Sequence, residues 1–170
     1  NLAEVILRMI LTYLKPLELN LLPVDLNSLV ENVLKGLHGD FLRCGVRSEL
    51  HLGAALPALS GDHSFLEQVL ETLFTNALRQ MPQGTILVVR TCQEAEMLEL
   101  SIRYPAPHLA ADDAEHFFYP FTTSSAAFEA ADLSMCKIIV NKHGGTIKVV
   151  LEPPKVLVIR ISLPLQDDRP

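Results

Sequence analysis

Apolar residues return at helical spacing in four segments of the chain, where positions i, i+3, i+4 and i+7 would line one side of a helix. The pattern predicts helices over residues 2–14, 26–41, 65–81 and 132–142. Lys15-Pro16 is expected to end the first helix, because proline disfavours helical geometry in the residue before it. Asp25 and Asp62 stand where N-caps are needed, and Gly144 stands where a left-handed residue would end the last helix.

Between these helices the chain alternates apolar and polar residues or gathers β-branched ones, as strands do. Strands are predicted at 22–25 (a short edge strand), 47–52, 85–91, 97–104, 146–151 and 156–163. The other connections are predicted as loops at 57–61 and 105–111, an acidic turn at 112–118, and a loop or lid at 122–131. This order predicts an α/β fold, a two-layer sandwich in which helices cover one face of a mixed sheet.

A proline-bounded stretch divides the first helix from the rest. We expect residues 1–15 to be the C-terminal part of a longer helix, 16–22 a linker, 23–165 one domain and 166–170 a tail. The helix is too short to span a bilayer. Its stripe is more apolar than a solvated appendage needs, with Leu2, Val5, Ile6, Met9, Ile10 and Tyr13 on one side. The stripe either packs back on its own domain or, as we favour, pairs with a second copy.

Length and charge limit the possible functions. The chain has 170 residues, 49% of them hydrophobic, and a formal net charge of −6. A domain of this size needs no disulfide or metal to fold, and its negative charge argues against binding nucleic acid or an anionic membrane. Its three cysteines, Cys44, Cys92 and Cys136, are far apart and form no CxxC motif. They are predicted to be free buried thiols in a reducing cytoplasm.

Two groups of polar residues that resemble sites have ordinary structural explanations. Asp112, Asp113, Glu115 and His116 could form a metal cluster, but acidic residues also suit a solvated first helical turn, which we favour. His143 is expected to be a helix C-terminal residue that the helix dipole favours, rather than a ligand or a phosphoacceptor.

Four motifs occur along the chain in an order that one known family shares. Residues 66–86 (LEQVLETLFTNALRQMPQGTI) resemble the asparagine box of bacterial sensor histidine kinases, and 118–123 (FYPFTT) resemble their phenylalanine box. Residues 133–145 (LSMCKIIVNKHGG) look like the helix after their second glycine box, and 15–27 are similar to the join that precedes their catalytic domain. The chain therefore resembles the catalytic domain of GHKL ATPases, which implies the Bergerat fold.

The resemblance also implies a nucleotide site. In the family, Mg²⁺ and ATP lie beneath a mobile lid, and the γ-phosphoryl group passes to a histidine on a separate dimerisation helix, which would lie upstream of Asn1. Asn76 matches the asparagine that holds Mg²⁺, so it is the implied metal ligand if ATP binds. Thr72, one turn earlier, stands where the family commonly has a second asparagine. Thr122 and Thr123 belong to the phenylalanine box.

Both glycine boxes depart from the family's pattern. Where the first box has an aspartate that reads adenine and two glycines, this chain has Tyr104, Ala106 and His108. The phenol of Tyr104 replaces a carboxylate, and Ala106 and His108 bring Cβ atoms where glycine leaves room. At the second box, Asp132 puts a carboxylate at a helix N-terminus that should receive phosphates, and like charges repel.

These departures predict a protein whose pocket binds ATP weakly or not at all. We expect the catalytic-domain portion of a two-component histidine kinase that is a pseudo-kinase, uses no cofactor and acts through interdomain or protein–protein contacts. The alternative is a divergent but active kinase that uses Mg-ATP with Asn76, Thr122 and Thr123. His108 is expected to be an incidental loop residue in either case.

The resemblance implies partners as well. They are the chain's own upstream dimerisation helix and sensor domains, a second copy in a homodimer, and a response regulator. We expect a cytoplasmic domain that contacts neither nucleic acid nor membrane, and whether the full-length protein is membrane-anchored upstream stays open.

Overall fold

A five-stranded sheet forms the centre of the computed structural model, which describes residues 1–14, 17–118 and 127–165. The strand order is β2-β4-β5-β7-β6. The strands are β2 (Arg47–Leu52), β4 (Ile86–Glu94), β5 (Met97–Pro105), β7 (Val156–Pro164) and β6 (Thr146–Glu152). β2 runs parallel to β4, and the other neighbours are antiparallel. The sheet is therefore mixed, as the sequence predicted.

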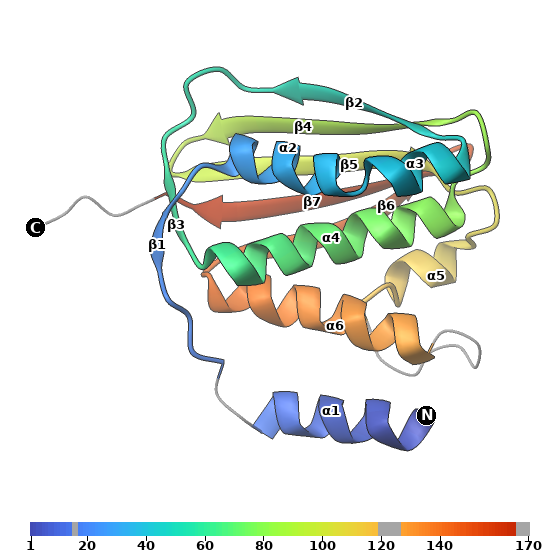
Figure 1. The fold of residues 1–170 in the computed structure, drawn as a ribbon, viewed down its shortest axis with the longest axis horizontal. Helices are drawn as coiled ribbons and strands as arrows, with labels where there is room; N and C mark the ends of the chain where they lie inside the picture. Colours follow the sequence, from blue (N-terminus) through green and yellow to red (C-terminus); the bar gives the residue numbers. More distant parts are fainter. Residues whose placement is uncertain (15–16, 119–126, 166–170) are drawn as a thin grey trace, which may run out of the picture.

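The longer helices of the domain cover one face of this sheet (Figure 1). They are α2 (Leu26–Gly36), α3 (His38–Cys44), α4 (His63–Gln80) and α6 (Ala127–Lys142). Alternation along β5 shows how the two faces differ, since Leu100 and Ile102 are buried in the core whereas Arg103 is exposed. The predicted two-layer α/β sandwich is confirmed.

Helix α1 (Leu2–Leu14) lies outside these two layers, beside α6 (Figure 1). Val5 is buried at 7% exposure, while Leu2, Leu7 and Ile10 remain about half exposed, at 58%, 57% and 49%. Part of the apolar stripe thus packs on the chain's own domain, and pairing of the rest with a second copy stays a prediction. None of the helices within the described residues has the length and hydropathy to cross a membrane.

Two predictions in the N-terminal half were wrong. The predicted helix 26–41 is two helices, α2 and α3, because the chain leaves the helical path at Leu37, with φ −95° and ψ 4°, directly after a glycine of low helix propensity. The predicted loop 57–61 contains β3 (Leu59–Gly61), which pairs antiparallel with β1 (Leu22–Val24). So short a strand carries too little alternation to be read from sequence, and its partner is distant in the chain.

The predicted loop or lid at 122–131 was wrong in part. Residues 127–131 belong to α6, which therefore begins ahead of the predicted residue 132. The stretch is rich in alanine, the best helix former, but it lacks the periodic apolar residues by which a helix is recognised. Residues 122–126 lie outside the described residues.

Helix α5 (Ala111–Glu115) occupies the predicted acidic turn. The carboxylate of Asp113 accepts a hydrogen bond from the backbone N–H of Ala110 at 2.8 Å and so caps the helix. This is the structural role that the sequence favoured for the acidic group.

The N-terminus of α4 is tied to distant parts of the chain. Asp62 is its predicted N-cap, and Oδ1 accepts from the backbone N–H of Phe65 at 3.2 Å while Oδ2 accepts from that of Asn20 at 2.8 Å. The backbone N–H of Asp62 donates to Nε2 of His143 at 3.0 Å, and Nδ1 of His143 lies 2.8 Å from the carbonyl oxygen of Ile139. His143 follows the C-terminal end of α6 as predicted, and it is also a buried link between α6 and α4.

The cysteines follow their prediction only in part. Cys136 on α6 is buried, whereas Cys44 and Cys92 are exposed. Cys44 ends α3 at the surface. Cys92 follows the buried Thr91 on β4, and strand alternation turns it to the face without helices.

Candidate functional site

Asn76, near the C-terminal end of α4, is buried at 5% exposure. Its side-chain nitrogen Nδ2 has no hydrogen-bond partner among the described residues. A buried donor without a partner costs about 1–3 kcal/mol. The fold therefore keeps a polar group at this position that its own neighbours do not satisfy, as binding sites often do.

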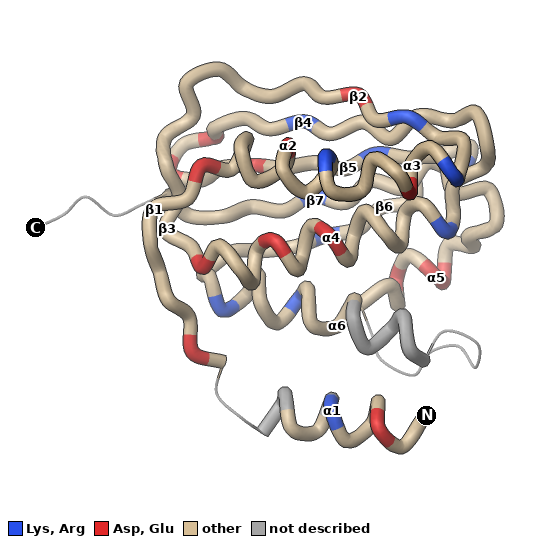
Figure 2. Tube along the Cα trace, in the orientation of Figure 1, with Lys and Arg blue, Asp and Glu red and all other residues tan. Residues whose placement is uncertain are grey.

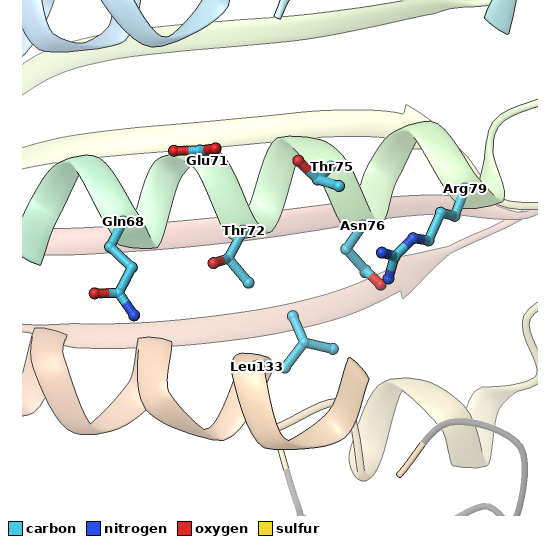
Figure 3. Close-up of a pocket in the computed structure, with 7 residues that line it drawn as sticks. All are labelled: Gln68, Glu71, Thr72, Thr75, Asn76, Arg79 and Leu133. Atoms are coloured by element: carbon cyan, nitrogen blue, oxygen red, sulfur yellow. The ribbon is translucent and has the colours of Figure 1, made fainter. Parts of the chain in front are cut away.

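This side chain borders a pocket of about 330 Å³ between α4 and α6. The pocket is lined by Gln68, Glu71, Thr72, Thr75, Asn76, Arg79 and Leu133. Figure 3 shows Thr72 and Asn76 on the side of α4 that faces Leu133. The structure thus brings together two of the residues that the sequence pointed to.

Several lining residues were not predicted from the sequence, although helical spacing could have found them. Gln68, Thr72 and Asn76 recur every fourth residue and share one side of α4, and Gln80 continues the same row. Polar residues at this spacing on a helix whose other side is buried are the signal that a site lies along it.

Tyr104, at the end of β5, is only 1% exposed. Its hydroxyl donates a hydrogen bond to Oε1 of Gln80 at 3.1 Å. Burial raises the pKa of the phenol far above its ordinary value, and the neighbouring Asn76 side chain opposes this shift only in part. The phenol is thus a neutral donor that is already used within the fold.

Two hydrogen bonds connect the loop after Tyr104 to Lys155. Ala106 is completely buried, and its backbone N–H donates to the carbonyl oxygen of Lys155 at 2.9 Å. The ammonium group of Lys155 donates to the carbonyl oxygen of Leu109 at 2.6 Å. His108 is exposed on this loop, and neither it nor Ala106 lines the pocket.

Three of the sequence-predicted positions cannot be placed at the site. Thr122 and Thr123 lie outside the described residues, and Asp132 lies in α6 with a side chain that is not described. The expected position of Asp132 at a helix N-terminus was wrong, because α6 already begins at Ala127. The electrostatic repulsion between its carboxylate and a phosphate stays a prediction.

Most of the sequence matches a known ATPase family. Residues 61–167 match the family model of the histidine kinase-, DNA gyrase B- and HSP90-like ATPases. The chain belongs to this family. Asn76, Tyr104 and Ala106 all lie within the matched residues, and of these three Asn76 lines the pocket described above.

Sensor histidine kinases are among the individual proteins to which this chain is similar. Sensor histidine kinase ZraS of Escherichia coli strain K12 is 28% identical over 160 residues, which cover 94% of this chain and 34% of ZraS. This chain thus spans about a third of the length of the curated relatives that it matches first.

Solved structures share the fold at low identity. The Acinetobacter baumannii histidine kinase AdeS matches with a TM-score of 0.77 and 24% identity, covering 97% of this chain and 77% of that structure. Histidine kinase ThkA, solved in complex with response regulator protein TrrA, matches with a TM-score of 0.78 and 22% identity, covering 96% of this chain and 47% of that structure.

Proposed function

We propose that this chain is the catalytic-domain portion of a two-component sensor histidine kinase and that it is a pseudo-kinase. It binds ATP weakly or not at all and acts through contacts with other domains or proteins. Its role is to hold or present the helix that precedes it, without nucleotide chemistry.

Buried Tyr104 is the observation that carries this proposal. At the position where the family reads the adenine amino group with a carboxylate, this chain has a phenol that is 1% exposed and donates to Gln80. The backbone N–H of Ala106 is likewise used, by the carbonyl oxygen of Lys155. A nucleotide base would find neither a carboxylate nor an unused backbone donor at these positions, so the residues do not fit ATP in the family's manner.

Loss of base recognition matters because phosphoryl transfer depends on placing the nucleotide and neutralising its charge. Because α6 begins at Ala127, Asp132 lies inside this helix rather than at its N-terminus. What we retain of its expected effect is the repulsion between its carboxylate and any phosphate group bound nearby, which would weaken nucleotide binding further. Both effects would lower the affinity for ATP.

A second candidate function is an active, divergent ATP-dependent histidine kinase. The unpartnered Nδ2 of Asn76 favours it, because a phosphate oxygen could accept the hydrogen bond that the fold leaves unmade. Thr72 on the same side of α4 could contribute a second polar contact. Asn76 would then be the ligand of Mg²⁺.

Calorimetric titration of Mg-ATP and Mg-ADP into the whole chain separates the two, with a thermal-shift scan beside it. A ligand at about 100 times its Kd stabilises the fold by about 2.7 kcal/mol, which shifts the melting temperature measurably. We expect neither heat nor shift at millimolar nucleotide. Micromolar binding that is lost in Asn76→Ala and kept in Asn32→Ala, an exposed asparagine on α2, would establish the active kinase instead.

Restoring the family's residues tests the cause of the loss. We expect Tyr104→Asp alone not to recover nucleotide binding, because the loop and the second glycine box remain unsuited to ATP. Adding Ala106→Gly, His108→Gly and Asp132→Gly is expected to recover it. Recovery by Tyr104→Asp alone would show that Ala106, His108 and Asp132 do not prevent nucleotide binding.

We also propose that the full-length protein is a homodimer held through α1 and the segment ahead of it. The exposed apolar residues of α1 support this, because a solvated helix does not need them. ThkA was solved with the response regulator TrrA, and a response regulator is the protein partner that we propose for this chain as well. Light scattering of a version extended upstream tests the dimer.

A further inference from the structure

The sheet face opposite the helices carries a row of positively charged side chains. Each strand of the five-stranded sheet contributes one Lys or Arg: Arg47, Arg90, Arg103, Lys148 and Arg160. All of them are exposed, and in β4, β5, β6 and β7 the residues beside them in the strand are buried or half-buried. Figure 2 shows Lys and Arg positions along the strands behind the helices.

Strand register places four basic side chains and one serine in a single line across the sheet. Arg90 is the Cα partner of both His51 and Ser101, and Arg160 is the Cα partner of both Ser101 and Lys148. We name His51, Arg90, Ser101, Arg160 and Lys148 the basic row. The row crosses all five strands, and its middle member has a small side chain.

Three of the four basic side chains in this row lack acidic partners, whereas the fourth, His51, lies beside Glu49. Among the described residues, Arg90, Lys148 and Arg160 form no ion pair. Lys148 and Arg160 lie directly opposite one another, and like charges in this position destabilise a sheet. The fold therefore keeps an arrangement that costs stability, in a chain whose net charge is −6.

Acidic residues of the same face have partners other than Arg90, Lys148 and Arg160. Glu152 accepts from Arg103 at 2.6 Å, Glu49 lies 3.0 Å from His51, and Glu99 accepts from the hydroxyl of Ser162 at 2.7 Å. Carboxylates thus flank these three cations but do not neutralise them.

Valines lie beside the basic row, on both sides of Arg103. Val88 and Val158 are both Cα partners of Arg103, and Val158 is the Cα partner of Val150. Val150 is 51% exposed and Val88 is half-buried, whereas Val158 is buried at 4% exposure. Apolar side chains next to unpaired charges are typical of protein interfaces, where burial supplies affinity and charge supplies specificity.

We propose that this face docks an acidic helix of a protein partner. Arg90 and Arg160 are two strands apart, which is about 10 Å at the usual strand spacing. Carboxylates at positions i and i+7 of a helix are separated by about 10.5 Å and match this distance. A long polyanion fits less well, because Glu49, Glu99 and Glu152 on the same face would repel it. The proposal does not depend on whether the pocket binds nucleotide.

Fluorescence anisotropy with a labelled alanine-rich helical peptide tests the proposal. The peptide carries glutamates at i and i+7, and a second peptide carries lysines there instead. We expect the whole chain to bind the glutamate peptide and not the lysine peptide, with an affinity that falls as salt is raised. No binding of the glutamate peptide, or tighter binding of duplex DNA or of phosphatidylserine vesicles, would overturn the proposal.

Two triple variants with the same change in net charge show whether the row itself binds. Arg90→Thr/Lys148→Thr/Arg160→Thr is expected to weaken peptide binding at least about tenfold, a loss that corresponds to about 1.4 kcal/mol. Lys35→Gln/Arg43→Gln/Lys142→Gln, which removes cations from α2, α3 and α6, is expected to change it less than about twofold, since charges beyond a Debye length are screened. Equal losses would mean that only net charge matters and would contradict a docking surface.

Thermal unfolding of Lys148→Thr checks that the row is not there to stabilise the sheet. We expect a melting temperature about 1–3 °C higher, because the like-charged pair is removed and threonine suits a strand. A lower melting temperature would assign these cations to the fold and would count against the proposal.

Discussion

At its N-terminal end, α4 is held by side chains that use all of their polar atoms, whereas near its C-terminal end one buried amide has no partner. Both side-chain oxygens of Asp62 and both ring nitrogens of His143 lie at hydrogen-bonding distance from backbone groups. Asn76 keeps an unpartnered Nδ2 beside the pocket. One end of α4 is thus held by a complete set of hydrogen bonds, whereas the other end keeps a polar group beside a pocket. Substitutions at the two ends should therefore change the free energy of unfolding in opposite directions.

The largest effect is expected at His143. His143→Phe keeps a ring in place but removes the acceptor of the Asp62 N–H, which is then buried without a partner. We expect a loss of about 2–3 kcal/mol in the free energy of unfolding, measured by urea denaturation. His108→Ala on the exposed loop should stay within about 0.5 kcal/mol. Equal effects of the two substitutions would mean that the buried link contributes nothing.

Asp62 offers a comparison between two N-caps. Asp62→Ala should cost about 1–2 kcal/mol. Asp25→Ala should cost less, because Asp25 accepts only from the backbone N–H of Ser28, at 3.1 Å, whereas Asp62 also holds Asn20. Amide hydrogen exchange at Asn20 should accelerate in the first variant and not in the second. Unchanged exchange at Asn20 would show that the linker is held by other contacts.

Substitution of Asn76 should raise the free energy of unfolding, whereas the two preceding substitutions lower it. Asn76→Leu replaces an unpartnered buried amide with an apolar side chain, and we expect a gain of about 1 kcal/mol, or about 2–4 °C in melting temperature. Asn32→Leu on the exposed side of α2 is the matched control and should change little. A destabilised Asn76→Leu protein would indicate that the amide is satisfied in solution, for example by water.

The effect of Tyr104 is absent at neutral pH and emerges only at high pH. Burial raises the pKa of this phenol, so the folded state stays protonated while the unfolded chain ionises near pH 10. The stability that depends on the protonated phenol is fully present below that pH. As the pH rises further, the free energy of unfolding falls by up to about 1.4 kcal/mol per pH unit. Tyr104→Phe should therefore lose stability less steeply between pH 9 and 11, as measured by urea denaturation. Parallel profiles would place Tyr104 in contact with solvent.

Much of the fold could be predicted because its signals are local. The long helices show apolar periodicity, the long strands alternate, and Asp25 and Asp62 cap the helices that follow them as expected. The break at Leu37 and the pairing of β3 with β1 could not be predicted, because they depend on small local deviations and on a partner distant in the chain.

The candidate site could be predicted only as a set of positions. Asn76 and Thr72 share a helix side, which spacing alone indicates. That the Tyr104 hydroxyl would donate to Gln80, and that His143 would be buried against Asp62, required strands and helices to be placed relative to one another. Sequence identifies which residue types are unusual, whereas packing decides which of their atoms remain available.

The small β1–β3 sheet has a mechanical consequence. Leu59 in β3 pairs with Val24 in β1 and is also bridged to Leu165, so the segments through which the chain enters and leaves the domain flank the same short strand. The β1 pairing extends over only three residue pairs. Tension applied through α1 would therefore act on the hydrogen bond between Asn20 and Asp62 and on these three pairs before it reached the five-stranded sheet. These contacts could open and close again while that sheet stays intact.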